Sequence, residues 1–371
     1  MIEIRNYQAG DETGFQKLGN LVEEHPWNHF NLENWKWKYR GNNPAGEPLS
    51  MYADNDSEII GHFAAIPMKY WIDGESVIGS HSVAMMIDPK WQNRGLIKFV
   101  ADKLIQQLEE QEISFTYGYP NDNAYELHIK LLGYEQIAQQ KLYIKRISLN
   151  DDGKEDLDCE PFTWKKILKF GDETNDLWEK SKNDYKVIVE RKSDFLNWRY
   201  LHRPDVPYYA FGVFNGNRLE GYCVLKLYQE EQTLRGHFID LFTSHNNRVC
   251  ASFLIRHGLQ FFKEMNASEV TLWMQGCSFM RDQLHENGFR EGGIAGAGWP
   301  DSTRPMIWLS IRRDVCSSRT AAITGYSSSS RTGPLSTSGA ISADPAVSTS
   351  IARPTHSTRP TPRRTRGPIR G

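Results

Sequence analysis

Apolar and polar residues follow two different periods along the first part of the chain. Alternation with a period of two predicts strands at residues 2–8, 49–54, 58–72, 76–88 and 113–119. Apolar residues three and four positions apart predict helices at 11–25, 95–111 and 123–132, the last of them closed by a glycine at 133. In the helix at 95–111 the apolar positions are Leu96, Phe99, Val100, Leu104, Ile105 and Leu108. This order predicts a mostly antiparallel mixed sheet flanked by helices, which is an α+β fold.

The same order of elements recurs in the second half of the chain. Strands are predicted near 208–214, 218–228, 234–243 and 269–274, and helices at 248–265 and 278–287. Three landmarks recur at a nearly constant separation: Trp37 to Trp198 is 161 residues, Gly61 to Gly221 is 160, and Gly133 to Gly288 is 155. The alternative is two α+β domains that share these positions by coincidence. The constant separation favours an internal repeat and therefore two tandem domains of the same type.

These patterns divide the chain of 371 residues into four segments. We expect an N-terminal domain at 1–146, a connector at 147–176, a C-terminal domain at 177–315 and a tail at 316–371. The tail contains no Lys, Glu, Asn, Gln, Trp or Phe and is rich in Ser, Thr, Pro, Ala and Gly, so it is predicted to be disordered. Its eight arginines and single aspartate indicate either a basic segment for an anionic partner or a C-terminus unrelated to the body. The abrupt change in composition favours the second interpretation.

Composition argues against several classes of function. A net charge of −2 gives no overall basic field for nucleic acid, and five scattered cysteines without CxxC spacing predict neither a disulfide framework nor a zinc site. The chain opens on a strand without a signal-peptide pattern, and no apolar run reaches the roughly 18 residues of a membrane span. We expect a cytoplasmic protein without metal, nucleic acid or membrane partners. The oligomeric state is left open.

One loop carries candidate chemistry. A predicted strand ends at Asp88-Pro89, and a helix begins at Gly95. The unpaired N–H groups and the positive end of the dipole at a helix start bind phosphate, Gly95 permits close approach of the backbone, and Arg94 adds charge. A single glycine is also what an ordinary strand-to-helix turn uses. Neither the GxGxxG nor the GxxxxGK[ST] pattern is present.

The spacing Asp88-Pro89-x-x-Gln92-x-x-Gly95-x-Ile97 resembles the acetyl-CoA signature Q/R-x-x-G-x-G/A of the GNAT acyltransferases. The resemblance extends over residues 1–315 as a tandem of two GNAT-like units. It implies an acyl-CoA co-substrate, acetyl-CoA in the simplest case. Its phosphates would bind at Gln92, Asn93, Arg94, Gly95, Leu96 and Ile97. Its pantetheine would meet the main chain of Ala84, Met85, Met86 and Ile87, and its arm would be held near Asn121 and Asn123.

The resemblance is incomplete at two places. Ile97 stands where the family has Gly or Ala, which narrows the approach to one phosphate. The tyrosine that protonates the leaving thiolate in the family is out of register, and Tyr125 and His128 lie nearest to it. For the general base that the amine needs, His81 is the candidate and His62 the alternative. For all four residues a structural role is the competing interpretation.

The second copy has no glycine in the corresponding loop, residues 240–249, and is expected to have lost cofactor binding. It would then serve as a scaffold or complete the acceptor cleft. Trp35 and Trp37 are candidates for a wall of that cleft, although recurrence of the motif at Trp198 favours a role in the core.

The sequence therefore predicts an acyl-CoA-dependent N-acyltransferase that acts on a primary amine of a small molecule or amino sugar, by direct attack in a ternary complex. One alternative is an aminoacyl transferase of the FemABX type, which uses charged tRNA. The phosphate loop argues against it, and so does the body without its tail, where 36 basic residues against 45 acidic ones leave a charge of −9. The other alternative is a non-catalytic GNAT-fold binding module, which Ile97 and the missing tyrosine favour.

Overall fold

A computed structural model describes residues 1–22, 32–120, 122–148, 161–230, 232–244, 246–274, 278–292 and 303–310. The N-terminal half contains, in chain order, β1 (Ile2–Asn6), α1 (Asp11–Val22), α2 (Leu32–Arg40), β2 (Leu49–Asn55), β3 (Glu58–Ile72), β4 (Glu75–Ile87), the 3₁₀ turn η1 (Pro89–Trp91), α3 (Leu96–Glu110), β5 (Phe115–Gly118), α4 (Asp122–Lys130) and β6 (Glu135–Arg146).

The C-terminal half has the same order with additions at its start and end. It contains β7 (Phe162–Ile167), α5 (Asp172–Ser181), the 3₁₀ turn η2 (Lys182–Asp184), β8 (Val187–Val189), α6 (Ser193–Leu196), the π-helical turn η3 (Asn197–Leu201), β9 (Tyr208–Asn215), β10 (Arg218–Glu230), β11 (Thr233–Thr243), α7 (Arg248–Glu264), β12 (Glu269–Met274), α8 (Ser278–Glu286), β13 (Arg290–Glu291) and β14 (Thr303–Ser310).

The predicted tandem α+β architecture is confirmed, and most of the predicted element bounds lie within two residues of those observed. Local chemistry explains why the hairpins form where they do. Asp73 and Gly74 between β3 and β4 both have positive φ, 46° and 92°, as a tight two-residue hairpin turn requires. Asp56 and Ser57 do the same between β2 and β3, with φ of 52° and 73°.

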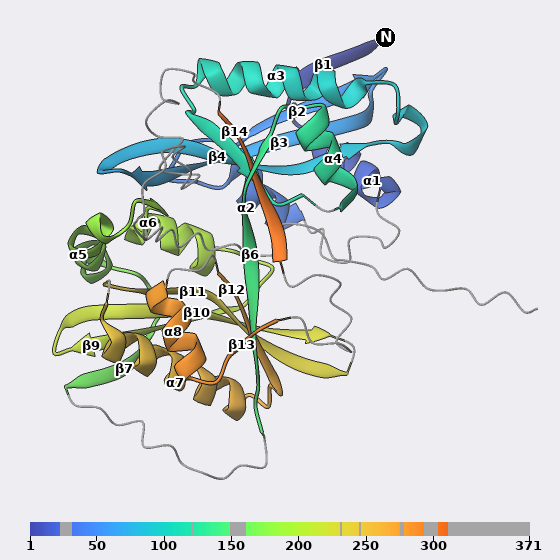
Figure 1. Cartoon of the computed structure of the whole chain (residues 1–371). Coiled ribbons are helices and arrows are strands. Elements are labelled where there is room, and N and C mark those ends of the chain that lie inside the picture. The colour runs from blue at the N-terminus through green and yellow to red at the C-terminus, as the bar shows by residue number, and fades with distance from the viewer. Residues whose placement is uncertain are drawn as a thin grey trace, which may run out of the picture.

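Each half has helices on both faces of its sheet (Figure 1). In β3, Phe63 belongs to a core cluster that includes α3, whereas the next residue, Ala64, belongs to the cluster that includes α1 and α2. In β10, Cys223 packs with α7 and α8, and Val224 packs with α5. Because successive strand residues point to opposite faces, both sheets are buried on both sides. The two halves therefore share the arrangement of helices on both faces as well as the order of strands.

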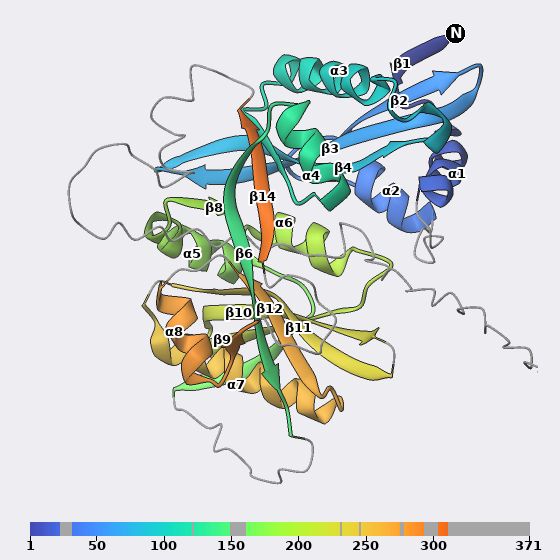
Figure 2. The same cartoon turned by 45° about the vertical axis from the view of Figure 1, so that its right-hand side comes forward.

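The two sheets join into one sheet of 14 strands within the described residues. The strand order is β1-β2-β3-β4-β5-β14-β6-β12-β11-β10-β9-β7, with β13 against β6 and β8 against β3. β6 and β14 run side by side through the junction in both views (Figures 1 and 2). The first part of β6 pairs with β14, from Glu135↔Trp308 to Lys141↔Thr303, and its last part pairs with β12, from Lys141↔Met274 to Arg146↔Glu269.

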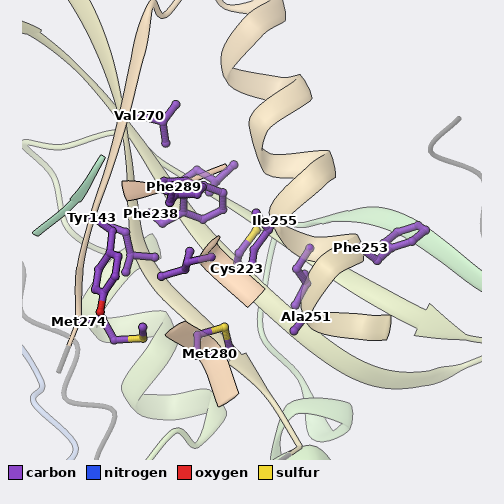
Figure 3. Close-up of a cluster of buried hydrophobic side chains, with 14 of the residues drawn as sticks. Tyr143, Cys223, Phe238, Ala251, Phe253, Ile255, Val270, Met274, Met280 and Phe289 are labelled. Atoms are coloured by element: carbon purple, nitrogen blue, oxygen red, sulfur yellow. The ribbon is translucent and has the colours of Figure 1, made fainter. Parts of the chain in front are cut away.

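This arrangement is an exchange of strands between the two halves. β14 comes from the end of the C-terminal half, yet it lies between β5 and β6 of the N-terminal half. In return, the end of β6 forms an interior strand of the C-terminal half, between β12 and β13. Figure 3 shows the result in the C-terminal core, where Tyr143 of β6 lies among Val270, Met274 and Phe289. Neither half completes its sheet from its own segment of the chain.

The structure adds detail to two sequence expectations. The described parts of the expected connector are residues 147–148 and 161–176. The second part contains β7, which pairs with β9 along the edge of the C-terminal sheet, and the start of α5. Residues 149–160 and the expected tail lie outside the described residues. The inclusion of Phe99 in the apolar stripe of α3 is wrong, because Phe99 is 63% exposed, whereas Leu96, Val100, Leu104 and Leu108 are buried. The straight row at spacing four faces the sheet, and Phe99 lies to the side of it.

In the described part of the chain, no helix has the length and hydrophobicity to cross a membrane. The same residues contain no group of three or more His, Cys, Asp or Glu side chains placed to hold a metal ion.

We expect the strand exchange to make folding of the two halves interdependent. A fragment of residues 1–148 leaves β5 and β6 without β14 and without β12, which exposes unpaired strand edges. It should lack a cooperative urea unfolding transition and should elute from gel filtration as aggregates. A fragment of residues 1–310 retains both exchanged strands and should unfold cooperatively. A monomeric, cooperatively folded 1–148 fragment would contradict the exchange.

Candidate active site

β4 and β5 are paired over only a short stretch. The parallel ladder consists of Ser80↔Thr116 and His81↔Tyr117, whereas β4 pairs with β3 from Glu75 to Ile87. Among the described residues, the edge of β4 from residue 82 to 87 therefore has no strand partner on the β5 side. Ser82 Oγ donates to the Tyr117 carbonyl at 3.0 Å, where the strands begin to separate. The opening exposes main-chain groups to which an extended ligand can add as a strand.

A bulge in β4 lies inside this opening. The register with β3 shifts between His62 and Ala64, and Ala84 on the opposite strand has φ of 51°. A left-handed conformation at alanine costs about 1 kcal/mol or more, so something must hold it. His62, which is fully buried, makes a 2.7 Å hydrogen bond to the Ala84 carbonyl through Nδ1. Because a carbonyl only accepts, Nδ1 carries the proton, and His62 fixes the bulge.

His62 stays neutral in this position. Its ring packs edge-on against Phe15, Tyr39 and Tyr52, at centroid distances of 4.6, 5.9 and 4.8 Å. Burial lowers the pKa of His62 to about 3, with the hydrogen bond to Ala84 opposing the shift. The described environment of His62 is therefore core, and its function in the geometry is to position β4.

The loop after β4 ends in an open helix start. Asp88 is buried, and its carboxylate accepts from the Lys90 N–H at 2.8 Å, which begins η1. The Gln92 side chain donates to the Ile87 carbonyl at 3.1 Å and so ties the loop to the strand. Gly95 has φ of 76°, precedes α3 without a side-chain cap, and has open space around its Cα. The N–H groups at the start of α3 are thus available to an anion.

The other predicted loop residues surround this helix start. Asn93 is exposed with φ of 60°, and the guanidinium of exposed Arg94 lies 5.1 Å from the Trp91 ring centre. Leu96 and Ile97 are buried. The isoleucine side chain that departs from the family pattern thus packs into the protein.

The two candidate acids on α4 differ in the state of their protons. His128 is buried between Phe63 and Tyr134, and its Nδ1 lies 2.8 Å from the Ala124 carbonyl. Burial lowers its pKa, so at neutral pH Nδ1 holds the only proton and Nε2 has none to give. The hydroxyl of Tyr125 donates to Gln136 Oε1 at 2.7 Å and carries a proton. Asn121 and the Asn123 side chain lie outside the described residues.

His81 lies on the opposite face of the sheet from α4. Its ring stacks on Tyr117 at 4.8 Å and meets Tyr119 edge-on at 6.0 Å. Burial, reinforced by the positive charges of Lys38 and Arg199, lowers the pKa of His81 to about 3. The structure therefore separates the predicted base from the predicted acids by the thickness of the sheet, with the β4–β5 opening between them.

The face of the sheet on which His81 lies is built by both copies of the repeat. Trp37 of α2 stacks on Trp198 of η3 at 5.4 Å with an angle of 24°, and Trp37 Nε1 donates to the Trp198 carbonyl at 2.9 Å. Trp35, by contrast, is a core residue that is 3% exposed. Trp35 and Trp37 also border an open groove of about 540 Å³, which is lined as well by His202 and Pro204 of the C-terminal half.

Sequence reasoning missed Lys38 and Arg199, which follow the paired tryptophans. Both are half-buried beside His81, and the pKa of Lys38 falls to about 7 through burial, with repulsion by Arg203 and Arg199. The recurrence of Trp-Lys-Tyr at residues 37–39 as Trp-Arg-Tyr at 198–200 was a visible signal of this pair. The repeat alone did not indicate that Lys38 and Arg199 are close in space, because this depends on the contact between α2 and η3.

The corresponding strand and helix start of the second copy carry different polar groups. Asp240 of β11 is buried and accepts from Arg191 at 3.2 Å, from Tyr200 at 3.3 Å and from Tyr222 at 3.1 Å. At the start of α7, the Asn247 side chain accepts from the Cys250 N–H at 3.2 Å. This side chain caps a main-chain N–H group, whereas the start of α3 has no side-chain cap. Among the described residues, β11 also lacks a partner on the β12 side beyond Phe238, so the copies differ in the helix cap and in the buried network at Asp240.

We expect His62 to make stability depend on pH. The pKa of His62 in the folded protein lies below the ordinary value near 6.5. Between these two pKa values His62 is protonated in the unfolded chain and neutral in the folded protein. Stability is then complete above pH 6.5 and falls as the pH decreases toward 3. The contribution lost between pH 7 and pH 5 is about 2 kcal/mol.

The matched variant is His62→Asn, whose amide retains a donor toward Ala84 without titrating. Urea unfolding at pH 7 and pH 5 should show a smaller loss for the variant than for the wild type, by about that amount. Other titrating groups contribute to both proteins and cancel. Parallel stability curves for the two proteins would refute the assignment.

Residues 14–134 match the model of the acetyltransferase (GNAT) family. No curated protein sequence matches the chain. Among solved structures, similarity extends to a GCN5-related N-acetyltransferase from Anabaena variabilis, with 15% identity, coverage of 84% of this chain and 73% of that one, and a TM-score of 0.61.

Two further structures extend the comparison over the tandem arrangement. A tandem GNAT protein from the clavulanic acid biosynthesis pathway, solved without AcCoA, has 11% identity, coverage of 84% and 99%, and a TM-score of 0.57. N-myristoyltransferase of Saccharomyces cerevisiae with bound myristoyl-CoA and inhibitors has 8% identity, coverage of 83% and 80%, and a TM-score of 0.55. At these identities the likeness establishes a shared fold.

Proposed function

We propose that this chain, which carries an acetyltransferase domain of the GNAT family at residues 14–134, is an acyl-CoA-dependent N-acyltransferase with acetyl-CoA as co-substrate. Its acceptor is a primary amine of a small molecule or amino sugar. The observation that carries the proposal is the difference between the two copies: the opening beside β4 leads to an uncapped helix start in the first copy, whereas Asn247 caps the equivalent helix in the second.

The first copy offers both main-chain and charged groups to a coenzyme. The pyrophosphate would take the N–H groups from residue 92 to 97, with Arg94 supplying a positive charge. The pantetheine would run along the edge of β4 from Ala84 to Ile87, in the space that β5 leaves open. The left-handed conformation at Ala84 shifts the register between β4 and β3 at this point. Asn121 and Asn123 remain predicted contacts of the arm.

The chemistry requires positioning more than covalent catalysis. An amine and a thioester held together in a reactive geometry avoid an entropic barrier of up to roughly 7–11 kcal/mol. The amine attacks the thioester carbon, the tetrahedral oxyanion forms, and the C–S bond breaks to release the coenzyme thiolate. Main-chain N–H groups along the opening are suited to stabilise the oxyanion.

The protonation states and hydrogen bonds of the candidate side chains decide which of them we assign as general base and general acid. We keep the general base at His81, on the face of the sheet that carries α2 and η3, which we name the acceptor face. Its neutral ring has a nitrogen lone pair for the proton of the amine, but burial and the charges of Lys38 and Arg199 make it a weak base until a bound anion offsets those charges.

On the opposite face we assign the general acid to Tyr125 rather than His128. The Tyr125 hydroxyl donates to the exposed side chain of Gln136 and can turn away from it, whereas the proton of buried His128 is held by the main-chain carbonyl of Ala124. The C-terminal domain acts as a scaffold whose η3 completes the acceptor face.

The phosphate loop can be tested by calorimetric titration with acetyl-CoA. Arg94→Ala should weaken binding about tenfold, the effect of losing one charge-assisted hydrogen bond. Gly95→Val should remove binding, because a β-branched residue disfavours φ of 76° and covers the open approach. Lys103→Ala, which removes an exposed positive charge farther along α3, is the matched control and should bind as the wild type does.

Two results would count against the proposal. Wild-type protein that gives neither binding heat nor a thermal shift with millimolar acetyl-CoA is not an acetyl-CoA enzyme. If Arg94→Ala and Gly95→Val bind acetyl-CoA as tightly as Lys103→Ala, the coenzyme phosphates lie elsewhere.

A further inference from the structure

The acceptor face of the site contains a junction built from equivalent residues of the two copies. Trp37 and Trp198 stack there, and the hydrogen bond from Asn34 to Asp205 at 2.8 Å gives α2 a second anchor one turn away. On α2, Lys38 follows Trp37 directly and lies one turn after Asn34. Its half-buried side chain is near enough to Arg199 and Arg203 of the C-terminal half for their charges to act on it.

Of the charged groups that act on Lys38, two are positive and one is negative. Arg203 and Arg199 repel Lys38, and the attraction that opposes them comes from Asp205. Asp205 already accepts from Arg203 at 2.7 and 3.1 Å and from Asn34 at 2.8 Å. Holding like charges together in a half-buried place is unfavourable, and an anion that binds between them relieves the repulsion.

The cluster adjoins the proposed reaction centre. The charges that lower the pKa of His81 are Lys38 and Arg199, and both are positive. His81 is paired with Tyr117 in the last rung of the β4–β5 ladder before the strands separate. Lys38 and Arg199 consequently lie on the acceptor face near the opening in which the thioester is proposed to react.

We infer that the acceptor carries an anionic group, a carboxylate or a phosphate, in addition to its amine, and that Lys38 and Arg199 bind this group. The inference rests on the proposed N-acyltransferase function and specifies its substrate class. The body of the protein has a net charge of −9 without the tail, so an anionic ligand is drawn to this place by the local cluster and not by the overall field. A guanidinium and an ammonium together suit either anion, because the first binds two oxygens and the second acts as a point charge.

The test compares amines that differ in charge. With acetyl-CoA as donor, β-alanine and phosphoethanolamine are measured against β-alaninamide and ethanolamine, and release of the coenzyme thiol gives kcat/KM. We expect the anionic member of each pair to be preferred by at least about tenfold, which corresponds to one charge-assisted contact. Which of the two anionic amines is the better substrate distinguishes a carboxylate from a phosphate site.

Variants connect the preference to the two residues. Lys38→Met and Arg199→Met remove one charge each at similar volume and should reduce the anion preference to within about threefold of unity. Lys38→Arg should restore most of it. Lys36→Met, on the exposed side of the same helix, is the control and should retain the wild-type preference. Acetyl-CoA affinity should be the same in all four variants, which separates acceptor binding from coenzyme binding and from misfolding.

Each outcome decides one of the two claims. A wild-type protein that treats charged and neutral amines alike, or an anion preference that survives both Lys38→Met and Arg199→Met, overturns the inference while acetyl-CoA binding stands. If acetyl-CoA does not bind, the proposed function fails. The anion site is then judged by thermal shift with β-alanine and inorganic phosphate, which should stabilise the wild type and Lys36→Met but not Lys38→Met.

Discussion

The pairing of β6 with strands from both halves is the constraint on which the rest of the molecule depends. The first part of β6 pairs with β14 along one edge, and its last part pairs with β12 along the other, so two segments that are far apart in the chain complete each other's sheets. This exchange fixes the orientation of the halves, and β8 strengthens it by pairing with the end of β3. Because the halves cannot rotate freely, η3 is held against α2 and the tryptophan pair can form. The acceptor face is thus a consequence of strand topology.

Repetition followed by divergence explains how one fold serves two purposes in the same chain. Both copies have a strand, a loop and a long helix in the same order, but the buried polar groups differ. In the first copy a neutral histidine holds the bulge at Ala84 and leaves the space beside β4 open. In the second, Asp240 gathers Arg191 and two tyrosine hydroxyls into a buried network. Such a network is costly to break and is suited to a scaffold, whereas a strand edge that leads to an uncapped helix start is suited to binding.

The chemistry of the candidate site was only partly visible in the sequence. The loop from Gln92 to Ile97 was identifiable, since a glycine between a strand and an amphipathic helix has a local meaning. The roles of His62 and His81 were not separable, because strand alternation alone does not say which neighbour faces a core and which faces a junction. Lys38 and Arg199 escaped notice for a stronger reason: a lysine and an arginine 161 residues apart acquire a common electrostatic environment only after two helical segments dock. The exposed position of Phe99 was also decided by packing and not by period.

What the sequence by itself determined was local and periodic. Hydrophobic spacing predicted the strands and helices that the two copies share from β2 to α4 and from β9 to α8, and the recurrence of Trp37, Gly61 and Gly133 predicted the tandem organisation. The spacing did not predict α2, β6 or β14. Each of these predictions depends on interactions between residues near in the chain, or on comparison of the chain with itself. The tertiary structure alone decided that β14 enters the first half and that β6 enters the second. Strand partners are chosen by the free edges available in the folded protein, and no pattern within a single strand encodes which distant edge it will meet.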